Sequence, residues 1–229
     1  MTLSRMSGDG ADGFLDGRLQ LLQGRGHRAG HDAVLLASKT PPEQGGLILD
    51  IGAGAGAVGL MAAVLAPRAT VGLVDIDPAS CALARENVAA NDLAARVIVH
   101  EADVISARSR RAAGLAAESA ALVLTNPPFY EPGRVRVTPD PGKARAHVAA
   151  VPLADWVRGA LALLAPGGTF VMIHRADALF DCLAAISGRL GGVSVEPIHS
   201  RPGAPAIRVL LSGVKGSKSP LVLLPSRVI

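Results

Sequence analysis

Short apolar runs of strand length alternate along most of this chain with Ala- and Leu-rich stretches of helical length. This order is typical of a parallel β-sheet that is covered by helices on both faces. The predicted strands are Leu47–Ile51, Thr70–Asp75, Arg96–His100, Ala121–Thr125 and Thr169–His174. The predicted helices are Val58–Leu65, Pro78–Asn91 and Leu153–Leu164, the last followed by a helix stop and turn at Pro166-Gly167-Gly168.

Two further apolar stretches, Val193–His199 and Ile207–Gly213, flank a Pro/Gly turn and predict an antiparallel pair at the end of the sheet. We therefore predict an α/β fold. It is a Rossmann-like, doubly wound, mostly parallel seven-stranded sheet with a C-terminal antiparallel hairpin and a short N-terminal cap. The cap segment, residues 1–45, contains one predicted helix, Asp32–Ser38, and residues 46–229 form the main domain.

The chain does not have the composition of a membrane or secreted protein. No apolar run approaches the roughly 18 to 20 residues needed to cross a bilayer. The N-terminus has no continuous apolar segment typical of a secretory signal, so we expect a cytoplasmic protein. Cys81 and Cys182 lie far apart, fit no metal spacing, and are predicted to be reduced core thiols. His27 and His31 have no evident further ligand, so no metal site is predicted.

The net charge is +4 and the isoelectric point is about 9.6. This balance favours a polyanionic partner such as nucleic acid.

Ligands of doubly wound sheets bind at the carboxyl ends of the strands. After the first predicted strand of the main sheet, the stretch LILDIGAGAGAVG contains Asp50, Gly52, Gly54 and Gly56 in the pattern D-x-G-x-G-x-G. Glycines here allow a ligand to approach the backbone, and the following helix start offers unpaired N–H groups. With Gly59 the same letters also form G-x-G-x-x-G, so the motif by itself fits either S-adenosylmethionine or a nicotinamide dinucleotide.

Acidic residues follow the next two strands. Asp75, with Ile76 beside it, is placed to accept hydrogen bonds from a ribose diol of either cofactor. Asp77, before Pro78, is predicted to cap the next helix. Asp103 follows the third strand and is interpreted either as an acceptor for an adenine amino group or as a turn residue.

The fourth strand is followed by Asn126-Pro127-Pro128-Phe129, and this segment decides between the cofactors. The chain has only four Phe, one Tyr and one Trp, yet Phe129 and the following Tyr lie together here. The Asn126 side-chain oxygen and the Pro127 carbonyl can each accept one N–H of a planar amino group, and Phe129 can stack on its flat face. As the nitrogen attacks a sulfonium methyl it becomes tetrahedral and positively charged, so these acceptors would bind the transition state best.

The sequence resembles the class I S-adenosylmethionine-dependent methyltransferases that carry an Asn-Pro-Pro-aromatic signature and methylate amino nitrogens. Within them it is similar to the bacterial tRNA adenine-N6 methyltransferases that modify the adenine next to the anticodon of valine tRNA. The resemblance extends to GHRAGHDAVLLAS, where Arg28, Gly30 and Asp32 match and His31 departs from the usual Thr, and to the C-terminal IRVLLSGVKGSKSPLVLLP.

This resemblance implies that residues 46–229 form a class I methyltransferase domain with S-adenosyl-L-methionine as cofactor. It implies a target amine held by Asn126, Pro127, Pro128 and Phe129. The cofactor pocket that it implies is lined by Gly30, Asp50, Gly52, Gly54, Gly56, Asp75, Ile76, Asp103 and Asn126.

The polar segment Glu131–His147 carries four cations, Arg134, Arg136, Lys143 and Arg145. We hypothesise that it covers the amine pocket and grips RNA phosphates; a solvated loop is the alternative. Lys215, Lys218 and Arg227 are candidates for the same surface.

Other functions fit parts of the pattern. Guanine-N2 methylation of ribosomal RNA and glutamine-N5 methylation of a protein use the same amine chemistry, although enzymes of the second kind carry a substantial helical domain before the glycine loop. A nicotinamide dehydrogenase would share the glycine loop and Asp75 but has no use for Asn-Pro-Pro-Phe. A non-catalytic RNA-binding module would tolerate loss of Asn126.

Overall fold

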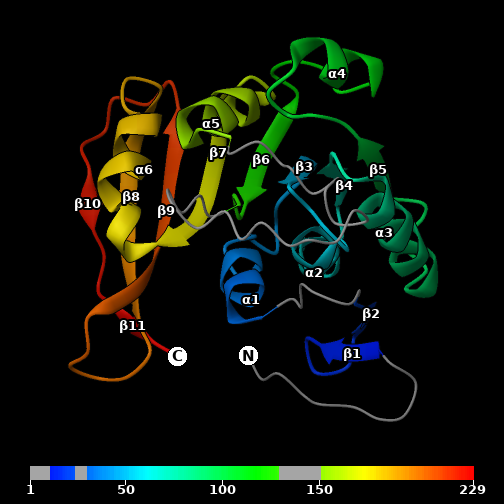
Figure 1. Cartoon of the computed structure of the whole chain (residues 1–229), viewed down its shortest axis with the longest axis horizontal. Helices are drawn as coiled ribbons and strands as arrows, with labels where there is room; N and C mark the ends of the chain where they lie inside the picture. Colours follow the sequence, from blue (N-terminus) through cyan, green and yellow to red (C-terminus); the bar gives the residue numbers. More distant parts are fainter. Residues whose placement is uncertain (1–10, 24–29, 129–150) are drawn as a thin grey trace, which may run out of the picture.

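A central sheet with seven long strands organises the molecule (Figure 1). The computed structural model describes residues 11–23, 30–128 and 151–229. In spatial order the long strands are β8 (Leu190–His199), β9 (Ala206–Lys215), β7 (Leu164–Arg175), β6 (Ala120–Thr125), β3 (Gly46–Ile51), β4 (Ala69–Asp75) and β5 (Val97–Glu101). The strands from β7 to β5 run parallel, whereas β9 is antiparallel to both β7 and β8.

This sheet confirms the predicted fold class. The predicted strands corresponding to β3, β4, β5 and β6 differ from the observed ones by at most one residue at either end. The predicted C-terminal hairpin is the antiparallel pair β8 and β9. Two very short strands, β10 (Val222–Leu223) and β11 (Arg227–Val228), add to β8 in parallel and close that edge of the sheet.

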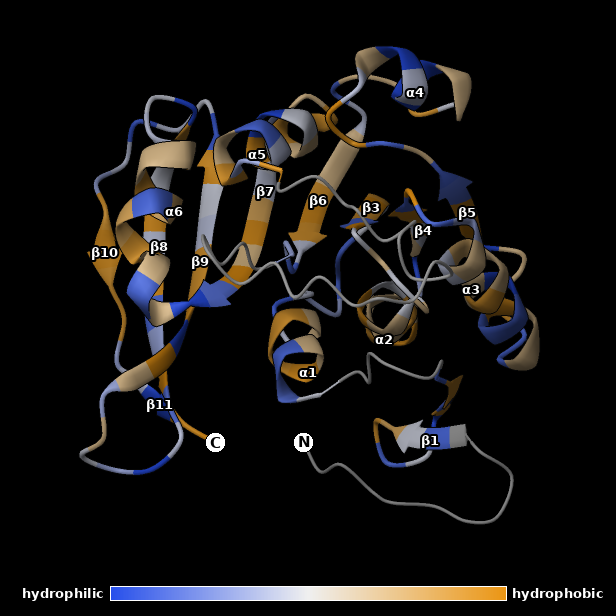
Figure 2. Ribbon diagram, in the orientation of Figure 1, coloured by the Kyte–Doolittle hydropathy of each residue, from blue (hydrophilic) through white to orange (hydrophobic). Residues whose placement is uncertain are grey.

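Helices cover both faces of the sheet. One face packs against α1 (His31–Ala37), α2 (Ala57–Leu65) and α3 (Pro78–Ala90). The other packs against α5 (Leu153–Leu161), α6 (Leu179–Ile186), which follows the 3₁₀ turn η2 (Ala176–Ala178), and the segments that flank α4 (Ala107–Ala112). Strands β3 and β6 between these layers are largely apolar, as is typical of parallel strands buried on both faces, whereas β5 ends in polar residues (Figure 2).

The connection from α5 to β7 differs from its prediction. We predicted a helix to Leu164 and then a turn at Pro166-Gly167-Gly168, but α5 ends at Leu161 and β7 begins at Leu164. The Pro-Gly-Gly segment therefore lies inside β7, where the register with β6 shifts between Ala120 and Leu122. Gly167 has a φ of 75°, and Pro166 has no N–H to donate, so these residues form an irregularity rather than a turn between elements.

The N-terminal segment contains a β-hairpin that we did not predict, in addition to the predicted helix α1. Its strands are β1 (Ala11–Phe14) and β2 (Leu19–Leu22). The side chain of Asn87 on α3 holds β2 like a neighbouring strand: its Oδ1 accepts from Leu22 N–H at 2.7 Å and its Nδ2 donates to Leu22 O at 2.9 Å. Leu19 and Leu21 are fully buried in the α1–α2–α3 core, so the hairpin is part of that core.

Among the described residues, no helix is long and apolar enough to cross a membrane.

Candidate active site

The strand order of the sheet reverses between β3 and β6. From β3 the chain adds β4 and β5 on one side and then crosses back to add β6 and β7 on the other. Ligands of open α/β sheets bind outside the carboxyl ends of the strands at such a reversal. Because Ile51 of β3 pairs with Thr125 of β6, the glycine-rich turn after β3 and the Asn-Pro-Pro segment after β6 leave the sheet side by side.

The three glycines of the turn after β3 have distinct surroundings. Gly52, Gly54 and Gly56 have φ values of 76°, 55° and 90°, a left-handed conformation that strains other residues. A Cβ on Gly56 would lie 2.9 Å from Leu73 Cδ1, so this glycine permits close packing on β4. A Cβ on Gly54 would meet no described atom within 4 Å. A ligand can therefore approach the backbone most closely at Gly54.

Asp50 lies beneath this turn and holds the start of α2. Its Oδ2 accepts from the Gly59 N–H at 2.8 Å, and Asp50 is only 2% exposed. Burial raises the pKa of Asp50 to about 7, the Gly59 hydrogen bond opposes that rise, and the charge of Asp75 adds to it. A Cβ on Gly59 would lie 2.2 Å from Leu73 Cδ2, so the last glycine of the G-x-G-x-x-G spacing serves helix–strand packing.

Asp75 lies at the end of β4 and ties that strand to the glycine turn. Its Oδ2 accepts from the Gly54 N–H at 2.7 Å, and its Oδ1 accepts from the Asp77 N–H at 3.0 Å. Each carboxylate oxygen has a further lone pair for a ligand hydroxyl. The next residue, Ile76, is 56% exposed, which is high for an aliphatic side chain at a sheet edge. The predicted ribose and cofactor contacts therefore lie together at this rim.

The two other acids near this edge make local hydrogen bonds. Asp77 caps α3 as predicted, because its carboxylate accepts from the N–H groups of Ala79 and Ser80. Asp103 follows β5, and its Oδ1 accepts from the Ile105 N–H at 3.0 Å. Asp103 thus forms a turn, and its contact with an adenine amino group stays a prediction.

Asn126 follows β6 directly. Its Oδ1 is buried, and no described residue donates a hydrogen bond to it. Of the two prolines that follow, Pro127 is buried and Pro128 is exposed. Buried acceptors are nearly always paired, so this oxygen is suited to accept a hydrogen bond from a bound ligand.

Trp156 on α5 is a residue of this site that the sequence reasoning missed. Its indole Nε1 donates to Thr125 Oγ1 at 2.9 Å, and Thr125 Oγ1 donates in turn to Ile51 O at 2.9 Å. The ring also covers the glycine turn, since a Cβ on Gly52 would lie 2.9 Å from Trp156 Cζ2. The one signal in the sequence was that this is the only Trp in the chain.

Of the segment just before α1, the structure describes Gly30 but not residues 24–29. Gly30 is exposed and precedes α1, and Asp32 forms an ion pair of 2.8 Å with Arg208 of β9. The matched Asp32 therefore has a structural partner across the sheet edge. The contact of Gly30 with the cofactor stays a prediction.

Several predicted residues lie outside the described part of the chain. These are Arg28, Phe129, Arg134, Arg136, Lys143 and Arg145. Within the described part, no three His, Cys, Asp or Glu side chains are grouped to hold a metal ion.

Comparison with known proteins places this geometry in a family. Residues 29–179 match the family model described as methyltransferase small domain. A tRNA1(Val) (adenine(37)-N6)-methyltransferase of Porphyromonas gingivalis is 31% identical over 189 residues, which are 80% of this chain and 72% of the relative. A relative of the same description from Musicola paradisiaca is 28% identical over 205 residues, 88% of this chain and 80% of the relative.

Solved structures agree with the sequence relatives. A predicted O-methyltransferase, Atu636 of Agrobacterium tumefaciens, is 33% identical with a TM-score of 0.71, and the match covers 86% of both chains. The Thermus thermophilus 16S rRNA N2 G1207 methyltransferase shares the fold with a TM-score of 0.57 at 21% identity, over 93% of this chain and 50% of that chain. The chain belongs to the methyltransferase small domain family.

Proposed function

We propose that this protein transfers a methyl group from S-adenosyl-L-methionine to the exocyclic amino nitrogen N6 of adenine in a tRNA. The observation that carries the proposal is the buried Oδ1 of Asn126, which has no donor among the described residues and lies beside the glycine turn at the strand-order reversal. The relatives with tRNA1(Val) adenine-N6 activity support adenine as the acceptor. The positive net charge suits an RNA substrate, and such a protein works in the cytoplasm.

The rim of the sheet fits the cofactor. The space above Gly54 admits a ligand, the free lone pairs of Asp75 suit ribose hydroxyls, and exposed Ile76 offers an apolar contact for a purine ring. S-adenosylmethionine would supply an electrophilic methyl group on a sulfonium. The full set that we propose to hold it is Gly30, Asp50, Gly52, Gly54, Gly56, Asp75, Ile76, Asp103 and Asn126.

The residues after β6 then orient and activate the amine. Asn126 Oδ1 and the Pro127 carbonyl each accept one amino N–H, and Phe129 stacks on the base. When the nitrogen becomes tetrahedral its N–H groups carry more positive charge, so both hydrogen bonds strengthen and the barrier falls. The methyl–sulfur bond would break as the nitrogen–carbon bond forms, and the sulfonium would leave as a neutral thioether. The positively charged nitrogen would then lose one proton to water, so no general base is proposed.

The acceptor can be tested by incubating the purified protein and radiolabelled S-adenosylmethionine with total RNA or total protein from a bacterium that lacks this gene. We expect N6-methyladenosine in the tRNA fraction. Asn126→Ala should lower kcat about 100-fold or more, because the lost hydrogen bond is strongest in the transition state. Asn91→Ala, at the end of α3 beneath the hairpin, is the matched control and should retain kcat.

The other outcomes are also informative. N2-methylguanosine in ribosomal RNA, or methylglutamine in protein, would retain amine methylation and overturn the substrate. Absence of label in every fraction would overturn the enzymatic proposal.

A further inference from the structure

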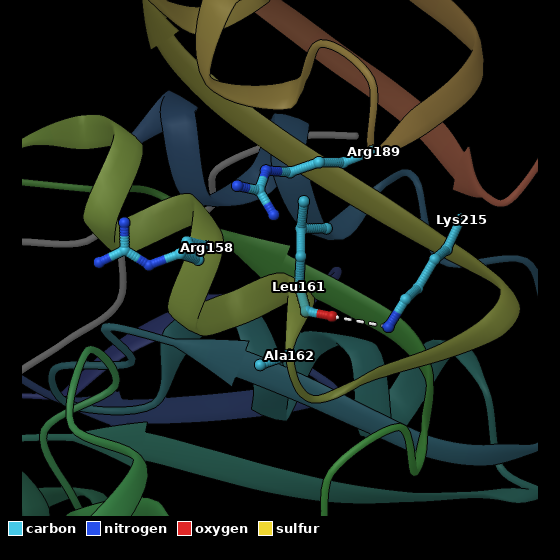
Figure 3. A pocket seen from close by; sticks show the side chains of 5 residues that line it. All are labelled: Arg158, Leu161, Ala162, Arg189 and Lys215. Atoms are coloured by element: carbon cyan, nitrogen blue, oxygen red, sulfur yellow. Dashed lines mark hydrogen bonds between the residues drawn. The ribbon is translucent and has the colours of Figure 1, made fainter.

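A basic pocket lies at the opposite end of α5 from the candidate active site (Figure 3). It has a volume of about 310 Å³ and is formed by the end of α5, the connection from α6 to β8, and the end of β9. Its lining residues are Arg158, Leu161, Ala162, Arg189 and Lys215. Three of these five side chains are cations and none is acidic, so the pocket has the charge of an anion site.

Lys215 is fixed within the wall of the pocket. Its Nζ donates to Leu161 O at 3.0 Å, to Leu164 O at 2.7 Å and to Glu118 Oε1 at 3.0 Å. An ammonium group has three protons, so all of its donors are used. Lys215 therefore contributes charge to the pocket and holds α5 against the start of β7, but it has no donor left for a ligand.

The two arginines have donors to spare. Arg189 is exposed, and among the described residues its guanidinium has no hydrogen bond or ion pair. Arg158 is paired through one nitrogen with Asp155 at 2.8 Å, and its side chain is 59% exposed. Such an exposed pair is weak, and a guanidinium has five N–H donors. Both arginines can therefore bind an anion that lies over Leu161.

The charge of the surrounding face is also positive. Lys215 and Arg158 are each offset by one acid, Glu118 and Asp155, which leaves Arg189 uncompensated. On the same face of the sheet, α4 carries exposed Arg108 and Arg111, whereas α6 adds the exposed acid Asp181. A polyanion that crosses this face would therefore meet more positive than negative charge.

We propose that this pocket binds a backbone phosphate of the substrate RNA, away from the target adenine. The inference rests on the proposed function. Planar guanidinium groups match phosphate oxygens through paired hydrogen bonds, and the apolar floor at Leu161 and Ala162 suits the adjoining ribose. The six residues of β6 separate the pocket's end of the sheet from Asn126 by roughly 15–20 Å. An RNA stem can span that distance with its target base at the carboxyl edge.

The double variant R158A/R189A tests this inference. The affinity of full-length protein for unmodified tRNA should fall about tenfold at 0.1 M salt, and the slope of log Kd against log salt should fall by about one. The affinity for S-adenosylmethionine and the single-turnover rate at saturating tRNA should stay at wild-type values, because neither arginine touches the candidate active site. Lys215 is left unchanged because its three hydrogen bonds hold the fold together.

Arg85→Ala is the matched control, since Arg85 is an exposed arginine on α3, which covers the opposite face. It should change neither the tRNA affinity nor the salt slope. If R158A/R189A methylates tRNA with wild-type affinity and wild-type slope, the pocket is a solvated surface and the inference is overturned while the proposed function stands. If wild-type protein neither binds nor methylates tRNA, the proposed function fails, and this inference fails with it.

Discussion

Two polar residues, buried Asp50 and half-buried Asn126 with its buried Oδ1, mark the edge where β3 and β6 end. Each is placed by a local feature of the sequence. Asp50 is the next-to-last residue of β3, just before the glycines, and Asn126 precedes two prolines. A buried group without a partner costs about 1–3 kcal/mol. Proteins retain such costs mainly at functional sites, so Asn126 Oδ1, to which no described residue donates, is the residue-scale argument for function.

The raised pKa of Asp50 predicts that the free energy of unfolding depends on pH. Its pKa is about 7 in the folded chain against an ordinary value of 3.8, so between these values the folded state binds a proton that the unfolded state releases. The stability from this group is fully present below pH 3.8 and is lost as pH rises through 7. Asn cannot ionise, so Asp50→Asn should remove this fall, which amounts to about 4 kcal/mol across the window. Urea unfolding of both proteins at pH 4 to 8 measures it, and parallel profiles would contradict the raised pKa.

At the scale of elements, the site depends on how β3, β6 and α5 are joined. Thr125 Oγ1 accepts a hydrogen bond from the indole N–H of Trp156 and donates one to the carbonyl oxygen of Ile51. One hydroxyl thus links the ends of both strands to the helix that covers the glycine turn. The candidate site is held together by this chain of hydrogen bonds as well as by the sheet.

Removing that hydroxyl should loosen the site. Thr125→Val keeps the shape of the side chain but leaves both the Trp156 Nε1 and the Ile51 carbonyl without their partner, and should cost about 1–3 kcal/mol of unfolding free energy. Affinity for S-adenosylmethionine should fall with it, because Trp156 also packs on Gly52. The fluorescence of Trp156, the only Trp, reports both unfolding and cofactor binding.

The control for this change is Thr70→Val, a substitution at an exposed position of β4. It should alter the unfolding free energy by no more than about 0.5 kcal/mol. Equal effects of the two substitutions would mean that the hydroxyl of Thr125 has no special role.

At the scale of the whole molecule, ion pairs connect segments from both ends of the chain. Glu196 of β8 is 6% exposed and pairs with Lys39, which follows α1, at 2.6 Å and with Arg227 of β11 at 2.8 Å. Two of the candidate RNA-binding cations near the C-terminus therefore have structural partners, because Arg227 pairs with Glu196 and Lys215 is held in the wall of the basic pocket. Glu196 therefore fastens the C-terminal strand to the sheet edge.

Glu196 should make stability fall in acid. Burial acts to raise its pKa, but the hydrogen bonds and charges of Lys39 and Arg227 outweigh burial and lower it. The stability from a lowered pKa is present above the ordinary value of 4.5 and is lost as pH falls through the folded value. Glu196→Gln should cost roughly 1–2 kcal/mol at pH 7 and much less at pH 3.

Denaturant titrations at the two pH values check this, with Glu86→Gln on the exposed side of α3 as the control. A penalty for Glu196→Gln that does not change with pH would show that packing, rather than charge, fastens the C-terminal strand.

Prediction from sequence succeeded for elements whose structure follows from their own few residues. It failed for elements whose structure depends on contacts with residues far away in the sequence. Strands β3, β4, β5 and β6 were predicted to within a residue at either end because each is a short, largely apolar run. The hairpin β1–β2 was missed because its four-residue strands are held by Asn87 and Asn91, about 70 positions later in the chain. The Pro-Gly-Gly segment has the composition of a turn, but pairing between β6 and β7 draws it into a strand.

The sequence by itself determined the class of the sheet, the residues at its carboxyl edge and the position of the Asn-Pro-Pro segment after β6, because periodicity, glycine conformation and proline geometry act over a few residues. Only the tertiary structure decided that Trp156 covers Gly52, that Asn126 Oδ1 is buried with no partner in the described part of the chain, and that Arg158 and Arg189 meet at one pocket. These contacts depend on strand order and on crossovers between strands. These contacts form only when the whole core is buried, so no short stretch of sequence determines them.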